Sequence, residues 1–400
     1  MLSKCAVFLV FFLAVPKTIP TNGCLYRNLM GETLNRFALC LIQPVHYSTE
    51  LVMRSFTPLQ PGERGNHRSS VMEVVRRGFA CLVSVAAFPL TGTWWCLGGI
   101  LDAIGDGIRS KPYSELEGLS REKINTDHTY TFLSLNTCMF WGGLPIFFGG
   151  VSPARDRMQE MAELIRQKNA DFLILQEVSY DPALALWNNI KDLYPHGFSR
   201  IQPSSWFKIE SCLFVASKYR IIGEPQCIPL PINSNITRVL FYFETDFFWV
   251  LATYLDPGMN EEDIAQRKKQ VDVIVNVVAE LEKKKPCIIL GDFNIRRDGK
   301  KDEEYRALIQ ENFHDYQATI PFSSSTATWT SLLSQYVWGK KDPMSEDFEL
   351  LDYVLVNKNS AEQLELKVEL VPTFDLSTSQ TKEKSLSDHR GYFTQLRIKK

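Results

Sequence analysis

The 400-residue sequence has little net charge and no paired-cysteine motif, and each absence excludes a class of protein. Its 44 Lys and Arg residues nearly balance 46 Asp and Glu residues, so the formal net charge is −2. The chain therefore lacks the overall basic excess that marks many nucleic-acid-binding domains. The nine cysteines include no C-x-x-C pair, so the sequence predicts neither a zinc site nor a disulfide framework.

The first 125 residues differ in character from the rest, and we predict two units, 1–125 and 126–400. Residues 5–15 form an uncharged apolar run after Lys4, which is too short to span a bilayer and is typical of a signal-peptide core. Residues 20–70 show little periodicity, and their last part, 60–70, is predicted to be an exposed linker. We expect this first unit to be a membrane-associating region followed by a linker.

The long apolar run at 78–101 contains no charged residue. As a helix it would extend about 36 Å at 1.5 Å per residue, which is enough for a bilayer core. Pro89 and Gly92 near its centre also allow a re-entrant hairpin, and a buried helix of a soluble domain is a third alternative. We expect membrane association, with the segment either spanning or re-entrant. The flanking charged residues are Arg76, Arg77, Asp102 and Asp106.

From residue 126 onward, helical and strand patterns alternate, which predicts an α/β domain. Helices are expected to begin at Pro153, at Pro182 and after Asn260, where proline or a capping side chain meets an apolar stripe. Strands are expected at 130–136, 171–177, 211–217, 239–243, 247–254, 287–291, 350–356 and 392–398.

Four of these predicted strands have polar residues at one of their ends, and these residues suit one kind of chemistry. The residues are Asn136, Glu177, the pair Asp292 and Asn294, and the pair Asp388 and His389. Carboxylate and amide oxygens are hard ligands for Mg²⁺, and an imidazole can exchange protons near neutral pH. Together they predict metal-assisted hydrolysis of a phosphoester.

The ordered set LN…QE…GDFN…SDH resembles the endonuclease/exonuclease/phosphatase superfamily over roughly residues 126–399. A single motif of this kind is weak, but four in order at strand ends are a strong signal. The resemblance implies a four-layer α/β sandwich, in which two packed β-sheets are flanked by helices. It also implies a phosphodiester hydrolase that depends on Mg²⁺ or Mn²⁺.

The metal and the attacking water can be assigned candidate residues on this basis. Glu177 is the first candidate for a metal ligand, with Asn136 and Asp388 as further candidates. Asp292 is expected to orient or deprotonate the attacking water, and Asn294 to orient that water or a phosphoryl oxygen.

A histidine and an arginine complete the expected site. His389 is expected to handle protons, and Asp352 matches the superfamily acid that orients this imidazole. Both Asp292 and His389 remain candidates for the base. Arg238 is a candidate to face the substrate phosphate.

A narrower resemblance points to the membrane-bound neutral sphingomyelinases. It is carried by the apolar segment and by KPYSELE at 111–117, DFLILQEV at 171–178 and LFVASKY at 213–219. This resemblance implies a phospholipid or sphingolipid substrate in a membrane, and no nucleic acid is expected. A nuclease or phosphatase on the same scaffold is an alternative, as is a non-catalytic lipid- or protein-binding module.

One position departs from the family pattern. Where members usually carry Thr-His-Leu, this chain has Thr253-Tyr254-Leu255. The Tyr254 hydroxyl can donate a hydrogen bond to a substrate or leaving oxygen, although its ordinary pKa near 10 prevents it from titrating as imidazole does. The departure favours the binding-module alternative, whereas the retained polar residues favour a hydrolase.

Overall fold

A computed structural model describes residues 23–57, 59, 67–123, 129–146, 150–202, 212–233, 236–258, 260–297, 303–316, 350–373 and 386–399. The helices are α2 (Gly23–Arg54), α3 (His67–Ile108), α4 (Ala154–Lys168), α5 (Tyr180–Ile190), α6 (Glu261–Leu281) and α7 (Glu303–Tyr305), with short turns η2 (Arg306–Gln310) and η3 (Lys358–Gln363). The Ser- and Thr-rich stretch 313–347 has no regular pattern in the sequence and predicts a loop, but most of it lies outside the described residues.

The strands form two sheets. A seven-stranded sheet contains β1 (Ser114–Glu117), β2 (Thr129–Met139), β3 (Phe172–Val178), β4 (His196–Ser199), β5 (Phe214–Ser217), β12 (Leu364–Val371) and β13 (Gly391–Ile398), in the order β1-β4-β5-β3-β2-β13-β12. A six-stranded sheet contains β6 (Ile222–Pro229), β7 (Val239–Glu244), β8 (Trp249–Tyr254), β9 (Cys287–Arg297), β10 (Phe313–Asp315) and β11 (Leu350–Asn357), in the order β10-β11-β9-β8-β7-β6.

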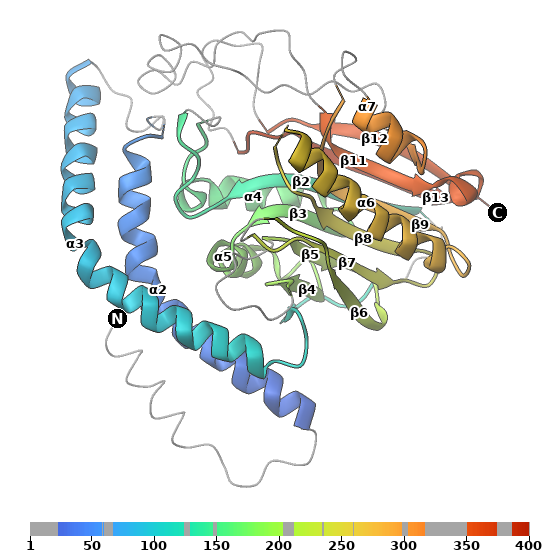
Figure 1. The fold of residues 1–400 in the computed structure, drawn as a ribbon, viewed down its shortest axis with the longest axis horizontal. Helices are drawn as coiled ribbons and strands as arrows, with labels where there is room; N and C mark the ends of the chain where they lie inside the picture. Colours follow the sequence, from blue (N-terminus) through green and yellow to red (C-terminus); the bar gives the residue numbers. More distant parts are fainter. Residues whose placement is uncertain are drawn as a thin grey trace.

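The two sheets pack against each other, and helices cover their outer faces (Figure 1). Along β3, Phe172 and Ile174 join the core that lies between the sheets, whereas Leu173 and Leu175 join a second core beneath α4 and α5. This alternation follows from the two-residue period of a strand and explains why β3 is apolar on both faces. Helix α6 packs on the other sheet through Val271 and Ile274. The predicted four-layer sandwich is therefore confirmed.

Local capping chemistry sets the start of α6 as predicted. The Asn260 side chain accepts a hydrogen bond from the Asp263 amide, and the Asp263 carboxylate accepts one from the Asn260 amide. Each group satisfies an amide that the first helical turn leaves without an intrahelical partner. The chain therefore leaves β8 and enters α6 at a defined residue.

The N-terminal part of the chain differs from two of the expectations. Residues 20–70 show little periodicity in the sequence, but Gly23–Arg54 form α2, and the last residues of the predicted exposed linker, 67–70, belong to α3. Helix α3 continues through Pro89 from His67 to Ile108, so this proline does not form the re-entrant hairpin that was one predicted alternative. The two helices lie side by side and bend along their length (Figure 1), and each contains one internal proline, Pro44 or Pro89. In addition, β1 lies within the predicted linker and pairs with β4.

Small residues allow α2 and α3 to approach closely. A Cβ atom added at Gly98 would lie 2.5 Å from Ile42 Cγ1, and one at Gly105 would lie 2.8 Å from the Gly31 carbonyl oxygen. The Asn35 side chain also donates to Asp106 Oδ1 over 3.1 Å. The two helices therefore form one packed unit, which we call the helical hairpin.

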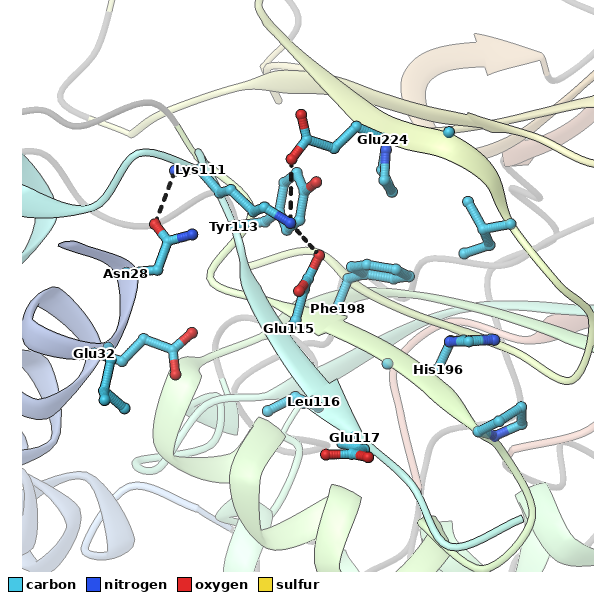
Figure 2. A pocket seen from close by; sticks show the side chains of 16 residues that line it. Asn28, Glu32, Lys111, Tyr113, Glu115, Leu116, Glu117, His196, Phe198 and Glu224 are labelled. Carbon is cyan, nitrogen blue, oxygen red and sulfur yellow. Dashed lines mark hydrogen bonds and ion pairs between the residues drawn. The ribbon is translucent and has the colours of Figure 1, made fainter. Parts of the chain in front are cut away.

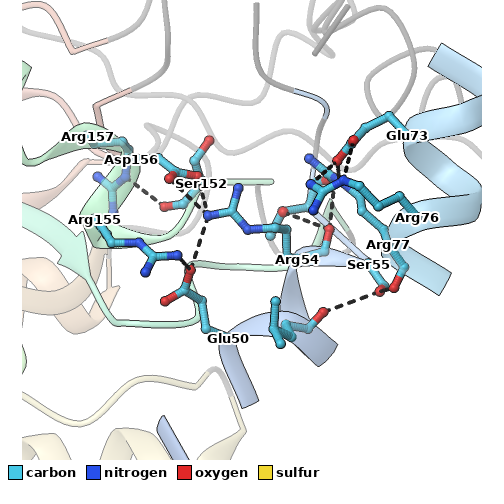
Figure 3. A network of polar contacts seen from close by, with 12 residues as sticks. Glu50, Arg54, Ser55, Glu73, Arg76, Arg77, Ser152, Arg155, Asp156 and Arg157 are labelled. Carbon is cyan, nitrogen blue, oxygen red and sulfur yellow. Dashed lines mark hydrogen bonds and ion pairs between the residues drawn. The ribbon is translucent and has the colours of Figure 1, made fainter. Parts of the chain in front are cut away.

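Ion pairs fasten this helical hairpin to the α/β sandwich (Figure 3). Arg54, at the end of α2, lies 2.8 Å from Asp156 in the first turn of α4, and Arg155 lies 2.5 Å from Glu50. At the other end of the hairpin, Arg200 follows β4 and lies 2.9 Å from Asp106 of α3. Because both ends are held, the hairpin has a defined orientation relative to the sandwich.

A half-buried histidine makes this attachment sensitive to acid. The His46 ring of α2 stacks on Trp141, which follows β2, with ring centroids 4.5 Å apart. Burial lowers the pKa of His46 to about 4, from an ordinary value of 6.5. The unfolded chain therefore takes up this proton at a higher pH than the folded chain does. The stability that the neutral His46 ring contributes is therefore fully present above about pH 6.5 and is lost as the pH falls toward 4.

We therefore expect the midpoint of thermal unfolding to fall between pH 6.5 and 4, and His46→Phe to reduce this fall. Phenylalanine keeps a flat ring against Trp141 but cannot be protonated. His314→Gln is the control, because it removes an exposed imidazole from β10. Calorimetry of the three proteins across this pH range tests the prediction, and an equal fall in wild type and His46→Phe would contradict it.

Candidate active site

The predicted polar residues converge where the two sheets meet. Strand β2 runs parallel to β3 in one sheet, and β8 runs parallel to β9 in the other, so their carboxyl ends can share an edge. At this edge Asn136 Nδ2 donates to Asp292 Oδ2 over 2.9 Å. Both side chains are buried, and this hydrogen bond joins β2 of the seven-stranded sheet to β9 of the six-stranded sheet.

An acid and a histidine lie beside this bond. His389 Nδ1 lies 2.7 Å from Asp352 Oδ2. Asp352 is opposite Asp292 in the antiparallel register of β11 and β9. Ligand atoms of Asp292, Asp352 and His389 all lie within 4.8 Å of one another. The structure thus brings together residues that are separated by up to 97 positions in the chain.

The segment that carries Asp388 and His389 is attached to β2 by a serine. Ser387 Oγ donates to the Asn136 carbonyl oxygen over 2.6 Å, and the His389 amide donates to Ser387 Oγ over 3.1 Å. Ser387 belongs to the SDH motif, but its place in the sequence does not indicate this role. Its hydroxyl holds the histidine segment against the strand that presents Asn136.

The turn-like geometry inside β9 explains the glycine of the GDFN motif. A Cβ atom at Gly291 would lie 2.0 Å from the carbonyl oxygen of Thr253 on β8. Three residues later Asn294 has a φ of +52°, and its amide donates to Asp292 Oδ1 over 2.9 Å. Asn294 Nδ2 also donates to the Leu255 carbonyl oxygen over 3.0 Å. The strand was expected to stop at 291, but it continues to Arg297 because pairing with β11 resumes after this distortion.

Glu177 of β3 and Tyr254 of β8 also contact each other across the two sheets. The Tyr254 hydroxyl donates to Glu177 Oε1 over 2.6 Å. Glu177 has a φ of +58°, which is uncommon for a residue with a side chain. The Arg238 guanidinium lies 3.9 Å from the centre of the Tyr254 ring, and Arg238 Nε donates to Asp256 Oδ1 over 2.9 Å.

Burial and like charge perturb the acids of this site. Burial raises the pKa of Glu177, and the neighbouring Asp388 carboxylate raises it further. Burial likewise raises the pKa of Asp292 to about 7, with an added contribution from Asp352. For His389, burial opposes the charged form, but Asp352 and its hydrogen bond hold the pKa well above its ordinary value. Four carboxylates therefore surround one imidazole.

This excess of buried and half-buried carboxylate fits a hard divalent cation. Glu177, Asp388 and Asn136 supply the carboxylate and amide oxygens that Mg²⁺ and Mn²⁺ prefer. Asp292 lies next to this set through its bond to Asn136. The compact cluster of Asp292 and Asp352 with His389 offers a second set of donor atoms that the sequence analysis did not assign to metal.

Arg157 is a buried residue that the sequence analysis missed. Its guanidinium donates to the carbonyl oxygens of Ser152 over 2.7 Å, of Thr137 over 3.1 Å and of Cys138 over 2.6 Å, and it also contacts the Leu386 carbonyl. These carbonyls belong to the end of β2, the start of α4 and the segment before Ser387. In the sequence, Arg157 stands out only as a charged residue on the otherwise apolar stripe of α4.

A separate cavity of about 850 Å³ contains none of the predicted site residues. It lies between α2, β1, β4 and β6, and Figure 2 shows Lys111 bonded to Glu115 and Glu224 in its wall. Glu32 and Tyr113 also line it. The pocket is therefore distinct from the cluster around His389.

The comparison with known families agrees with this geometry. Residues 133–389 match the profile of the Endonuclease/Exonuclease/phosphatase family. The chain belongs to this family. The match includes Asn136, Glu177, Asp292 and His389, which identifies the protein as a member of a hydrolase family. No curated protein matches the chain.

Solved structures of the family are similar to the chain at low sequence identity. Sphingomyelinase C from Streptomyces griseocarneus is 18% identical with a TM-score of 0.47, over 67% of this chain and 99% of that chain. Truncated TDP2 from Caenorhabditis elegans is 18% identical with a TM-score of 0.46, over 68% and 98%. An endonuclease/exonuclease/phosphatase from Beutenbergia cavernae is 17% identical with a TM-score of 0.47, over 68% and 72%.

The close contact at Gly291 predicts that this family member cannot accept a side chain there. Gly291→Ala should lower the free energy of unfolding by more than about 1 kcal/mol, because the methyl group forces β8 and β9 apart. Gly99→Ala is the control: it adds the same methyl group in α3 where no atom lies within 4 Å, and it should be neutral or stabilising. Urea unfolding of both variants tests this, and equal effects would contradict the role of Gly291.

Proposed function

We propose that the protein is a metal-dependent phosphodiester hydrolase that acts on a phospholipid or sphingolipid in a membrane and releases the phosphorylated headgroup. The observation that carries the proposal is the convergence of Asp352, His389, Asp292 and Asn136 within one buried cluster. An oriented imidazole beside buried carboxylates can activate water, and membership of the family supports hydrolysis as the reaction.

The attacking water would be handled by His389 and Asp292. Because His389 Nδ1 faces Asp352, Nε2 is the ring nitrogen that can exchange a proton with the water. Asp352 positions the imidazole and stabilises its protonated form. Asp292 is held by Asn136 and by the Asn294 amide, so its carboxylate has a defined orientation toward the same water.

Asn294 and Arg238 would orient the water and the phosphate. Asn294 Nδ2 is bonded to Leu255, which leaves its Oδ1 to accept a hydrogen bond from the water. Arg238 is buried, and its Nη1 has no partner among the residues that the structure describes. A buried guanidinium of this kind suits a phosphate oxygen, which gives the unpaired donor an acceptor.

Glu177, Asp388 and Asn136 would hold the cation, which we propose to be Mg²⁺ or Mn²⁺. When bound, such an ion polarises the phosphoryl oxygen and offsets charge on the leaving oxygen. The chain's own contribution is to hold these donors in fixed orientations, with Asn136 buried and the two carboxylates half-buried. Asn136 is fixed by its bond to Asp292, and its carbonyl accepts from Ser387.

We further propose that α3 holds the catalytic domain, 126–400, at a membrane and that 1–125 is the membrane-associating region. The range Arg68–Ile108 is long and apolar enough to cross a bilayer, but only 6% of its most apolar window is buried in the structure. Phe79, Leu82 and Leu90 are 69%, 70% and 69% exposed. Such a long apolar surface has a strong driving force to leave water.

Two observations favour a helix that lies in the membrane surface over one that crosses the bilayer. The 42 residues of α3 extend roughly 63 Å, about twice the thickness of a bilayer core. Asp106 near its C-terminal end is paired with Arg200 of the sandwich, and Arg77 near its N-terminal end donates to the Arg54 carbonyl oxygen over 2.6 Å. These contacts would break if the helix inserted alone.

The catalytic assignment predicts that Asp292→Asn and His389→Ala each reduce hydrolysis by about 10²–10⁴-fold. Because the two groups act on one water, the double variant should lose less than the product of the single effects. Asp272→Asn is the control, since Asp272 is an exposed residue of α6. Each protein is assayed with Mg²⁺ on sphingomyelin vesicles, phosphatidylcholine vesicles and DNA.

The same assay separates the alternatives. Near-full turnover by either single variant would reject its assigned role. Cleavage of DNA but of neither lipid would support a nuclease on this scaffold. A wild-type protein that is inert on all three substrates yet binds the vesicles would support the non-catalytic binding module.

The membrane proposal predicts that the full chain floats with phosphatidylcholine vesicles in a density gradient. Replacing both Phe79 and Leu82 with Asp should weaken binding more than about 100-fold, since burial of each side chain contributes roughly 1.5–3 kcal/mol. Leu119→Asp is the control, because Leu119 is 74% exposed but lies outside α3. Wild-type protein that stays at the bottom, or a double variant that floats equally well, would contradict the proposal.

A further inference from the structure

The tyrosine that replaces the usual family histidine is already engaged in the structure. Tyr254 lies at the end of β8 and opposite Asp292 in the parallel register with β9. Its hydroxyl donates to Glu177 Oε1 over 2.6 Å, across from one sheet to the other. We propose that Tyr254 is a positioning residue that orients the metal-binding carboxylate of Glu177, an inference that rests on the proposed function. It replaces the expectation that this hydroxyl serves the substrate or leaving oxygen.

The chemistry of the phenol supports this assignment. A tyrosine hydroxyl has one proton to donate, and in this structure the proton is directed at a carboxylate oxygen. A hydrogen bond to a carboxylate is shorter and stronger than one between neutral groups. The bond engages Oε1, so Glu177 keeps Oε2 as the oxygen that can bind a cation. The same proton cannot serve the leaving oxygen at the same time.

A buried chain of contacts fixes the Tyr254 ring. The Arg238 guanidinium lies 3.9 Å from the ring centre, and Arg238 Nε donates to Asp256 Oδ1 over 2.9 Å. Gln270 of α6 donates from Nε2 to Asp256 Oδ2 over 2.8 Å and accepts from the Asp256 amide over 3.1 Å. Arg238 is 1% exposed and Gln270 is 0% exposed, so neither side chain can move without disturbing the core.

The backbone of Glu177 adds a reason for a positioning partner. Its φ of +58° places the residue in the left-handed region, where a side chain is disfavoured. On the preceding residue, Gln176, the carbonyl oxygen accepts a hydrogen bond from Thr137 Oγ1 over 2.9 Å. This backbone contact does not fix the carboxylate, whereas the Tyr254 hydroxyl donates directly to it. Residues that hold a metal ligand in place without touching the ion commonly tune metal affinity, and their mutation typically lowers that affinity about 10–100-fold.

The test measures binding of Mg²⁺ alone by calorimetry, with no substrate present. We expect Tyr254→Phe to weaken Mg²⁺ affinity about 10–100-fold and Glu177→Gln to weaken it further or abolish it. Tyr305→Phe is the matched control. It removes another buried tyrosine hydroxyl, which donates to Asp315 Oδ2 over 2.9 Å, outside the site. This control should bind Mg²⁺ as the wild type does.

The outcomes separate the inference from the function on which it rests. If wild type binds no Mg²⁺, or Glu177→Gln binds it as wild type does, the proposed metal site is wrong. If wild type and Glu177→Gln differ but Tyr254→Phe keeps wild-type affinity, the metal site stands and the positioning role is overturned. A loss of affinity in Tyr305→Phe equal to that in Tyr254→Phe would show a general effect on folding and would also overturn it.

Turnover provides a second readout. With Mg²⁺ raised to saturate each protein, Tyr254→Phe should recover kcat to within a few-fold of wild type, because the hydroxyl does not touch the reacting atoms. A kcat that stays lower by about 10²–10³-fold, the loss expected for a donor to a developing oxyanion, would show that Tyr254 contacts substrate instead.

Discussion

The rest of the structure depends on the gathering of four carboxylates, two buried and two half-buried, at one edge where the sheets meet. Charged groups removed from water are stable only when they are paired and hydrogen-bonded. Here Asn136 and the Asn294 amide donate to Asp292, the Tyr254 hydroxyl donates to Glu177, and His389 pairs with Asp352. These partners come from both sheets, so the site forms only where the two sheets pack together. The remaining negative charge is the physical basis for a divalent cation.

The sequence predicted the parts of this arrangement that depend on neighbouring residues. Alternating apolar runs predicted the strands, Asn260 predicted the start of α6, and the polar residues at strand ends marked the site. The long-range contacts could not be predicted, because they depend on how the two sheets pack. Arg157 is one example: its acceptors are carbonyls from separate segments, which leave no side-chain pattern. Helix α2 is a second example. It is stabilised by close packing on α3, and its sequence has no regular apolar period that would predict a helix.

We propose that the helical hairpin holds the catalytic cluster at a membrane surface. Residues at both of its ends form ion pairs with the sandwich, through Arg54 with Asp156 and through Asp106 with Arg200. An apolar helix held in this way presents its exposed side in a constant direction relative to the active site. For a substrate confined to a membrane, such attachment raises its effective concentration at the site without any new contact to the reacting group. The structure therefore adds the orientation of this apolar run relative to the candidate site, which the sequence pattern alone does not predict.

We propose that water activated by this cluster attacks the phosphorus of a membrane lipid. The most direct test of this proposal is hydrolysis of sphingomyelin vesicles by the full chain in ¹⁸O-labelled water with Mg²⁺, followed by mass spectrometry of both products. We expect ¹⁸O from the solvent to enter the phosphocholine and the ceramide to carry none. Label in the ceramide, or the absence of any release from the vesicles, would contradict it.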